Sequence, residues 1–323
     1  MLSAYYFRAH MYTCVPHQIR EDMEWMADAG TDAVVLGILE QDLHAAVENI
    51  ERVASEARRV GMEMWVTPSR LGNLVAGCPK VPSIFSAMHH EAWAYDREGH
   101  PQLSFLGPVA SVHHPATFDF FCDTLFDVLK KFPVSGIIWD ELKNLSMMDY
   151  SQSAQNAIPA DQIDRLDAHV DATIAFFDRV GEALLSRYPE LRISLFLEGT
   201  LDGYPVERCA RMQNLHDFGC DGRPFALADQ GSSDSGPTPA KKCLCDHGPY
   251  FKELAQQTNK RSLYLIENHA MKDEDIAHMD KRLPEILGME IDHLIYYYFP
   301  RSVQSPYRCM NTLRRHLQEY AAR

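Results

Sequence analysis

The sequence predicts one α/β domain, a (β/α)8 TIM barrel covering residues 1–323, with long loops after its third and fourth strands. Two observations lead to this fold. Strand-like apolar runs alternate with helix-like segments along almost the whole chain, which is typical of βα units around a parallel sheet. The length of 323 residues suits a single large barrel, and no repeat, linker or low-complexity tract divides it. We therefore expect one catalytic barrel domain.

The expected strands are short runs of apolar and β-branched residues. The second is the clearest, because Val34, Val35, Leu36 and Ile38 form a nearly continuous apolar run, whereas the sixth has the weakest pattern. In chain order the expected strands cover residues 4–12, 33–39, 63–67, 134–140, 192–197, 217–220, 262–266 and 293–299.

The segments between the strands have apolar residues at helical spacing, and some have proline near the start or glycine after the end, as helices commonly do. The first has Pro16 near its start and Gly30 after its end, and the second stops at Gly61. The expected helices cover residues 16–29, 43–60, 116–131, 160–187, 206–215, 249–258, 274–287 and 306–320.

Three long connections interrupt this alternation. The segment 68–115 contains several prolines and clustered aromatic and histidine residues, 144–159 precedes a long helix, and 228–239 is rich in Gly, Ser and Pro. Connections of this length in compact domains usually serve a function.

Composition narrows the class of protein. The net charge of −14 argues against a broad surface for nucleic acid or anionic membrane. The N-terminus lacks a basic segment followed by a long apolar run, and the eight cysteines are scattered, as in reduced thiols. We therefore expect a cytoplasmic enzyme without nucleic-acid or membrane partners, and we leave a homo-oligomer open.

Polar and charged residues collect where the expected strands end. In a barrel of parallel strands these positions surround one mouth, which carries the chemistry. The strand-end residues are Arg8, His10, Tyr12, Glu40, Trp65, Thr67, Arg70, Asp140, Glu141, Lys143, Glu198, Asp221, Glu267, Asn268, His269, Tyr297, Tyr298 and Arg301. The excess of carboxylates favours cations, a metal, or hydroxyl-rich substrates that develop positive charge.

Two glutamates stand out, because Glu141 follows the fourth expected strand and Glu267 the seventh. Glycosidic cleavage needs an acid to protonate the leaving oxygen and a carboxylate to meet the developing oxocarbenium ion. We expect Glu141 to be the general acid, with its pKa raised by burial and by neighbouring carboxylates. We expect Glu267 to stay ionised and to be held by Arg8, His10 or Tyr298.

This arrangement resembles the retaining (β/α)8-barrel glycoside hydrolases of the clan-A kind, in which the acid/base ends strand four and the nucleophile ends strand seven. The resemblance covers the barrel layout, and its specific part is confined to the segments around Glu141 and Glu267. It implies a retaining glycosidase acting on a carbohydrate substrate. In that group an Asn commonly precedes the acid/base, whereas this chain has Asp140, which alters how the sugar 2-hydroxyl would be held.

Further residues are predicted to bind substrate or to compete for a catalytic role. Glu198 either holds a sugar hydroxyl or is a rival nucleophile, and Trp65 is a possible stacking platform for a pyranose ring. The predicted substrate-binding residues are Arg8, His10, Glu40, Trp65, Asp140, Glu198, Asp221, His269 and Tyr298.

No cofactor is expected, since the chain has no dinucleotide, P-loop, nucleophile-elbow or zincin motif. No catalytic metal is assigned. A zinc site of Cys243, Cys245 and His247 is left open, although the spacing is not that of a usual zinc knuckle.

Two alternatives remain beside the glycosidase. A metal-dependent sugar isomerase or epimerase would draw its ligands from Glu198, Asp221, Glu267 and His269. A non-catalytic sugar-binding barrel would use the same side chains only for recognition. The sugar, the anomer and exo or endo action stay open.

Overall fold

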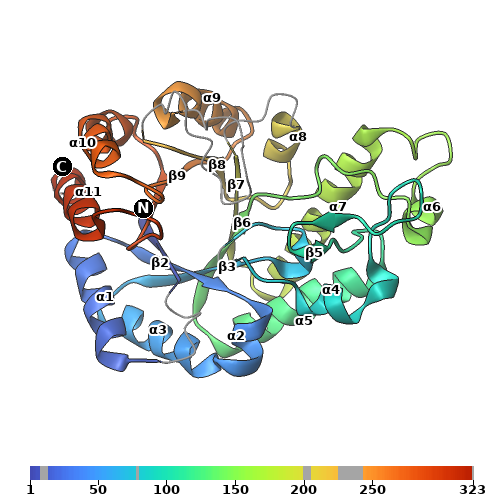
Figure 1. The fold of residues 1–323 in the computed structure, drawn as a ribbon, viewed down its shortest axis with the longest axis horizontal. Helices are drawn as coiled ribbons and strands as arrows, with labels where there is room; N and C mark the ends of the chain where they lie inside the picture. Colours follow the sequence, from blue (N-terminus) through green and yellow to red (C-terminus); the bar gives the residue numbers. More distant parts are fainter. Residues whose placement is uncertain (8–13, 78–79, 199–204, 225–242, 322–323) are drawn as a thin grey trace.

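The computed structural model describes residues 1–7, 14–77, 80–198, 205–224 and 243–321. Eight parallel strands close a barrel in the order β1-β10-β9-β8-β7-β6-β3-β2, so the predicted (β/α)8 fold is confirmed (Figure 1). The barrel strands are β1 (Leu2–Tyr6), β2 (Ala33–Ile38), β3 (Glu63–Pro68), β6 (Val134–Asp140), β7 (Arg192–Glu198), β8 (Asp217–Gly222), β9 (Arg261–Ile266) and β10 (His293–Tyr297).

Helices lie between the strands around the outside of the barrel. The principal ones are α1 (Pro16–Asp28), α2 (Glu40–Ala45), α3 (Val47–Arg59), α5 (Pro115–Lys131), α7 (Leu166–Arg187), α8 (Val206–Ala210), α9 (Leu244–Gln257), α10 (Asp273–Leu287) and α11 (Pro306–Ala321). Seven of the expected strands, including the weak sixth one, lie at their predicted places. The first was expected over residues 4–12, but β1 begins at Leu2 and ends at Tyr6, and residues 8–13 lie outside the described part of the chain.

Some helix boundaries differ from the sequence prediction. The segment expected as one helix over 43–60 is split at Ala46 into α2 and α3. Helix α9 begins at Leu244 rather than at Pro249, which lies inside the helix. Proline favours a helix start, but here the buried contacts of α9 against the barrel extend the helix N-terminally past it.

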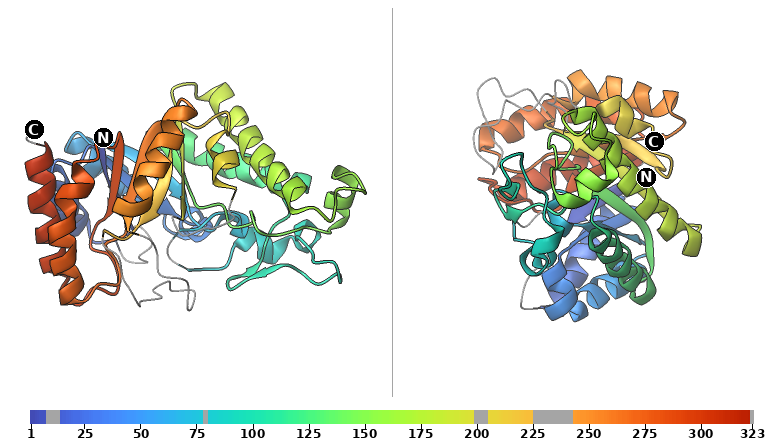
Figure 2. Two further views of the ribbon diagram at one scale, coloured as in Figure 1. Left: turned by 90° about the horizontal axis from the view of Figure 1, so that it is seen from above. Right: turned by 90° about the vertical axis from the view of Figure 1, so that its right-hand side faces the viewer.

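The long connections after β3 and β6 form an extension beside the barrel (Figure 2). It contains η2 (Leu71–Asn73), α4 (Ile84–Met88), η3 (His90–Ala92), the hairpin of β4 (Leu103–Ser104) and β5 (Gly107–Pro108), and α6 (Gln152–Ala157). The two connections are joined because Asp149 accepts hydrogen bonds from the Tyr95 backbone amide at 3.1 Å and from the Ser111 hydroxyl at 2.5 Å.

Alternation along the strands sorts side chains into two cores. Residues of one parity, including Tyr5, Trp65, Ile138 and Phe196, fill the barrel interior, and those of the other parity pack against the helices. Trp65 occupies space left by Gly136, where a Cβ atom would lie 2.3 Å from the indole ring. The interior is therefore a packed apolar plug with a polar cluster at each end.

The cluster at the amino-terminal end of the barrel centres on the fully buried Asp217. Its carboxylate accepts hydrogen bonds from Ser194 at 2.8 Å, and pairs with His216 at 2.9 Å and His293 at 3.1 Å. Burial opposes ionisation, but the two histidines outweigh it and hold the pKa of Asp217 well below its usual range.

This depressed pKa predicts acid-dependent stability. A carboxylate with a lowered pKa in the folded state contributes stability above the unfolded pKa of about 4 and loses it as the pH falls below that value. We expect Asp217→Asn to lower the free energy of unfolding at pH 7 by about 3–5 kcal/mol, with a smaller difference from wild type at pH 3.

Urea denaturation at several pH values measures this difference. Asp280→Asn is the matched control, because Asp280 also pairs with a histidine but its side chain is 42% exposed. We expect the control to change stability by about 1 kcal/mol or less. An effect of Asp217→Asn that is equally small at pH 7 would contradict the prediction.

Candidate active site

At the carboxyl ends of the barrel strands, four residues with carboxyl groups occupy positions that face the barrel interior by the alternation of strand residues. Glu198, Asp221 and Glu267 follow the interior residues of β7, β8 and β9 at spacings of two, and Asp140 does the same on β6. Glu141 comes directly after Asp140. The structure therefore brings the predicted carboxylates from four neighbouring strands to the same end of the barrel.

The backbone at the end of β6 is fixed in a strained conformation. Glu141 has a φ of 42°, which is uncommon for a residue with a side chain. Its amide donates to the carbonyl of Phe196 at 3.1 Å, while the amide of Ala76 donates to the carbonyls of Asp140 and Glu141 at 2.6 and 3.1 Å. These bonds join the end of β6 both to β7 and to the connection after β3. Strain held in this way is common at functional sites.

Asp140 and Glu141 form a buried acidic pair, each about 7% exposed. Burial, followed by the negative charge of Glu141, raises the pKa of Asp140 to about 7. The nearby cations Lys143 and Arg70 oppose this rise, as does the hydroxyl of Tyr5, which donates to Asp140 Oδ2 at 3.2 Å. The pair can therefore hold a proton near neutral pH.

Lys143 links two carboxylates of the site. Its ammonium group forms a salt bridge with Glu141. Burial alone would lower the pKa of Lys143, but Glu141, Glu198 and Asp140 together raise it, so the group stays charged. Glu198 is thereby placed within electrostatic range of the end of β6.

Glu267 lies in a rigid setting at the end of β9. It is 3% exposed, and its amide donates to the carbonyl of Gly222 at 2.9 Å. The next residue, Asn268, exchanges two hydrogen bonds of 2.9 Å with the backbone of Tyr297 on β10. Glu267 is thus tied to both neighbouring strands.

A series of aromatic rings connects the two sides of the mouth. The ring of Tyr5, which holds Asp140, lies 5.4 Å from that of Tyr297, and Tyr297 lies 5.4 Å from the ring of His269. The predicted residue His269 therefore faces the interior end of β10. Its carbonyl also accepts a hydrogen bond from the buried guanidinium of Arg223, which follows β8.

Three predicted substrate-binding residues are not at the mouth, and these predictions are wrong. Trp65 is fully buried near the opposite end, where its indole donates to Glu63, the first residue of β3, at 2.9 Å. Tyr298 has the outward parity and donates to Asp22 on α1 at 2.7 Å.

Glu40 is the third. It begins α2 and its carboxylate accepts hydrogen bonds from the Ser83 hydroxyl at 2.6 Å and the Phe85 amide at 2.7 Å. It anchors the start of α4, and burial raises its pKa. The predicted residues Arg8 and His10 lie outside the described part of the chain.

Sequence reasoning missed Tyr5 and Arg223. Both were detectable in principle by parity, because Tyr5 alternates with Ser3 on β1, and Arg223 lies two residues beyond Asp221. Tyr5 was overlooked because the first strand was expected to continue to residue 12, so that its end was sought later in the chain.

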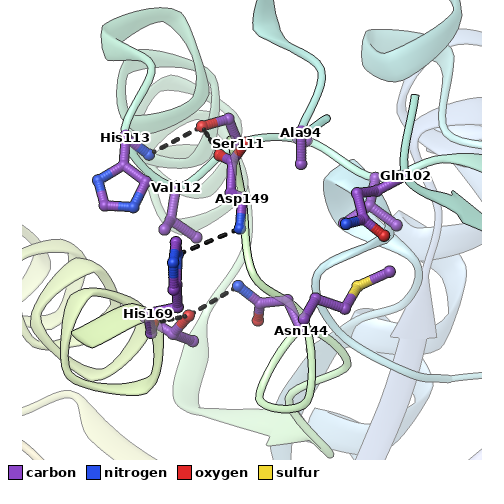
Figure 3. Close-up of a pocket in the computed structure, with 12 residues that line it drawn as sticks. Ala94, Gln102, Ser111, Val112, His113, Asn144, Asp149 and His169 are labelled. Carbon is purple, nitrogen blue, oxygen red and sulfur yellow. Dashed lines mark hydrogen bonds between the residues drawn. The ribbon is translucent and has the colours of Figure 1, made fainter. Parts of the chain in front are cut away.

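A small cavity supports the loop that follows Glu141 (Figure 3). Its volume is about 20 Å³, enough for one water molecule but far too small for a sugar. Asn144 donates to Thr173 of α7 at 2.7 Å, and His169 of the same helix accepts from the Asp149 amide at 3.1 Å. The cavity is structural, and its lining fastens the β6 connection to α7.

The described residues contain no group of three or more His, Cys, Asp and Glu side chains placed to hold a metal ion. Cys243, Cys245 and His247, which the sequence left open as a zinc site, do not form such a group, and the His247 ring bonds to the carbonyl of Asp221 at 3.1 Å. The ligand set of the isomerase alternative is likewise not assembled. Within the same described ranges, no helix has the length and apolar character needed to cross a membrane.

Comparisons with known proteins agree with the fold. No protein-family model matches the chain, and no curated protein matches it in sequence. Similar solved structures are glycoside hydrolases with barrel domains. A β-galactosidase from the psychrophilic Marinomonas ef1 superposes with a TM-score of 0.68 at 11% identity, covering 98% of this chain and 59% of that enzyme.

Two further solved structures show the same likeness. The catalytic domain of a β-amylase from Paenibacillus polymyxa has a TM-score of 0.61 at 10% identity and is covered over 98% of its length, with 99% of this chain. An α-L-fucosidase from Paenibacillus thiaminolyticus has a TM-score of 0.62 at 12% identity, covering 99% of this chain and 48% of that one. At these identities the likeness establishes the barrel fold.

The hydrogen bond from Tyr5 to Asp140 predicts a measurable titration. A donor stabilises the ionised carboxylate, so Tyr5→Phe should raise the pKa of Asp140 further, by about 1 unit. Carbon-13 NMR of labelled aspartate carboxyls measures it directly, with Asp140→Asn to assign the signal. Tyr6→Phe is the matched control, because the neighbouring Tyr6 donates to Asp22 on the outer side of the barrel. A carboxyl of Asp140 that titrates near pH 4 would refute the proposed environment.

Proposed function

We propose that the chain is a glycoside hydrolase that cleaves a small glycoside or oligosaccharide by a retaining double displacement. Glu141 acts as general acid/base and Glu267 as nucleophile. The observation that carries the proposal is the placement of buried carboxyl groups from β6 and β9 at the same end of one closed barrel. We assign the whole chain to this one catalytic domain.

The surroundings of Glu141 support an acid/base role. Burial and the Glu141 charge raise the pKa of Asp140 to about 7, which lowers the negative charge beside Glu141 near neutral pH. In the first step Glu141 donates a proton to the leaving oxygen. In the second step Glu141 takes a proton from the attacking water, and Lys143, its salt-bridge partner, stabilises the carboxylate between the two steps.

The surroundings of Glu267 support a nucleophile. Its amide bonds to the carbonyl of Gly222, and the side chain of the next residue, Asn268, bonds to the backbone of Tyr297. Strands β7 and β8 separate β9 from β6, so the two carboxyl groups approach the mouth from different directions. Glu267 would attack the anomeric carbon while the bond to the leaving oxygen breaks. Asp221 and Glu198, on the two strands between them, are placed to bind sugar hydroxyls, and His269 and Asp140 complete the predicted contacts.

The similar solved structures support the reaction class without indicating this chain's sugar, because they include a β-galactosidase, a β-amylase and an α-L-fucosidase. The unassembled ligand set disfavours the isomerase alternative. The cytoplasmic location stays a prediction.

Two substitutions test the assignment of roles. We expect Glu141→Gln to lower kcat/KM on natural glycosides by roughly 10²–10⁴-fold, with a smaller loss on aryl glycosides whose leaving groups need little protonation. Glu267→Gln should abolish turnover of both kinds of substrate, because no other group forms the glycosyl intermediate. Glu98→Gln, an exposed position in the connection after β3, is the matched control and should retain full activity.

Covalent trapping tests the mechanism. A 2-fluoro glycoside of a substrate sugar should label Glu267, as read by peptide mass spectrometry, and proton NMR should show the product anomer first formed to be that of the substrate. Labelling of Glu198 instead would overturn the nucleophile assignment. Initial formation of the opposite anomer would exclude the retaining mechanism while leaving a glycosidase.

A further inference from the structure

Arg70 is a largely buried cation that makes no side-chain hydrogen bond and no salt bridge among the described residues. The residue is 9% exposed, and its Nε atom is buried. Buried charges are normally paired, because an unpaired charge loses its hydration without compensation. Its backbone has a φ of 61°, a further cost for a side-chain-bearing residue. A charge kept under these conditions indicates a ligand.

The position of Arg70 ties it to the acidic pair. It lies two residues beyond β3, and its amide donates to the carbonyl of Ala76 at 3.0 Å, while the amide of Ala76 donates to the carbonyl of Asp140 at 2.6 Å. One short backbone segment therefore holds both residues. Arg70 is also close enough to Asp140 for its charge to lower the pKa of that carboxyl. The guanidinium thus belongs to the mouth of the barrel.

An exposed aromatic ring lies beside this guanidinium. Phe105, in the turn between β4 and β5, is 57% exposed. The guanidinium of Arg70 lies 5.6 Å from the centre of its ring, and the ammonium of Lys80 lies 4.9 Å from it. A largely exposed phenylalanine at a site that carries carboxylates is suited to stack against the apolar face of a sugar ring.

Charge identifies the ligand class. The chain has a net charge of −14, but the ring of Phe105 is flanked by two cations. A sugar carboxylate matches the planar guanidinium group through two parallel hydrogen bonds, which Arg70 does not make to any described residue, whereas the hydroxyls of a neutral sugar provide no matching negative charge. A singly charged group is also better tolerated than a dianion beside Asp140 and Glu141.

We propose that Arg70 and Phe105 form a subsite for a hexuronic acid, in which Arg70 binds the sugar carboxylate and Phe105 stacks on the ring. This inference rests on the proposed glycosidase function and names its substrate class: a glycoside with a uronic acid residue at or next to the bond that is cleaved. Arg70 is a specificity-determining residue in this arrangement, and it takes no part in proton transfer.

Binding measurements test the subsite without relying on catalysis. Isothermal titration with glucuronate and galacturonate, and with glucose and galactose as neutral counterparts, is carried out on the full chain. We expect at least one uronate to bind roughly 10–100-fold more tightly than its neutral counterpart. Arg70→Met should abolish this preference, and Phe105→Ala should weaken binding of both sugars.

Matched variants separate recognition from misfolding. Arg97→Met removes a cation from the same connection that also lies over an aromatic ring, but Arg97 pairs with Asp164 and is 63% exposed. It should keep the full preference. Arg70→Met removes no hydrogen bond or salt bridge to a described residue, so this variant should fold, and its Tm checks that it does. Arg70→Lys retains the charge without the fork, so it should keep only part of the preference and provides a second test if Arg70→Met does not fold.

The outcomes distinguish the subsite from the proposed reaction. Equal affinity of the wild type for uronates and neutral sugars, or an equal loss in Arg97→Met, would overturn the subsite. Tight binding of inorganic phosphate or sulfate, at the affinity of the uronate and lost in Arg70→Met, would also overturn the uronate assignment. Hydrolysis of neutral aryl glycosides without a preference for uronides leaves the glycosidase and rejects the subsite. Uronate binding through Arg70 with no hydrolysis of any glycoside supports the subsite and rejects the glycosidase.

Discussion

Asp140 and Glu141 are two adjacent buried carboxyl groups, and the other contacts at the mouth of the barrel stabilise this pair. Burial and the charge of Glu141 both favour the protonated form of Asp140, and they raise its pKa to about 7. The Tyr5 hydroxyl, the Lys143 ammonium and the nearby Arg70 charge offset part of the cost. Backbone bonds from β7 and Ala76 hold the strained turn that keeps the pair together.

Two buried aspartates of the same barrel have pKa values shifted in opposite directions. Asp217, at the amino-terminal end, receives hydrogen bonds from serine and histidine and stays ionised, whereas Asp140, at the other end, has a carboxylate neighbour and tends to keep its proton. Environment alone therefore separates a structural carboxylate from one suited to proton transfer. The apolar plug that includes Trp65 and Phe196 keeps the two clusters apart.

Much of the barrel could be predicted from the sequence, because strand-like runs and helical spacing are local patterns. The places of Glu198, Asp221 and Glu267 followed from where those runs stop. The predictions that were wrong depended on the direction of a side chain: Trp65 points to the far end of the barrel, and Tyr298 has the outward parity. A shift of one residue along a strand moves a side chain from the barrel interior to the helix side. A strand end that is located only approximately therefore does not tell which way a side chain points.

Local sequence patterns are enough to predict the eight-stranded barrel and the carboxylates at one mouth, since apolar runs must bury both faces of a parallel sheet and then end in polar residues. Which of those groups interact depends on how the chain packs in three dimensions. The pairing of Tyr5 with Asp140, the contact of Lys143 with Glu141, and the charge of Arg70 beside Phe105 join segments far apart in the chain. Such contacts depend on barrel closure and on the paths of the long connections, which no local pattern encodes.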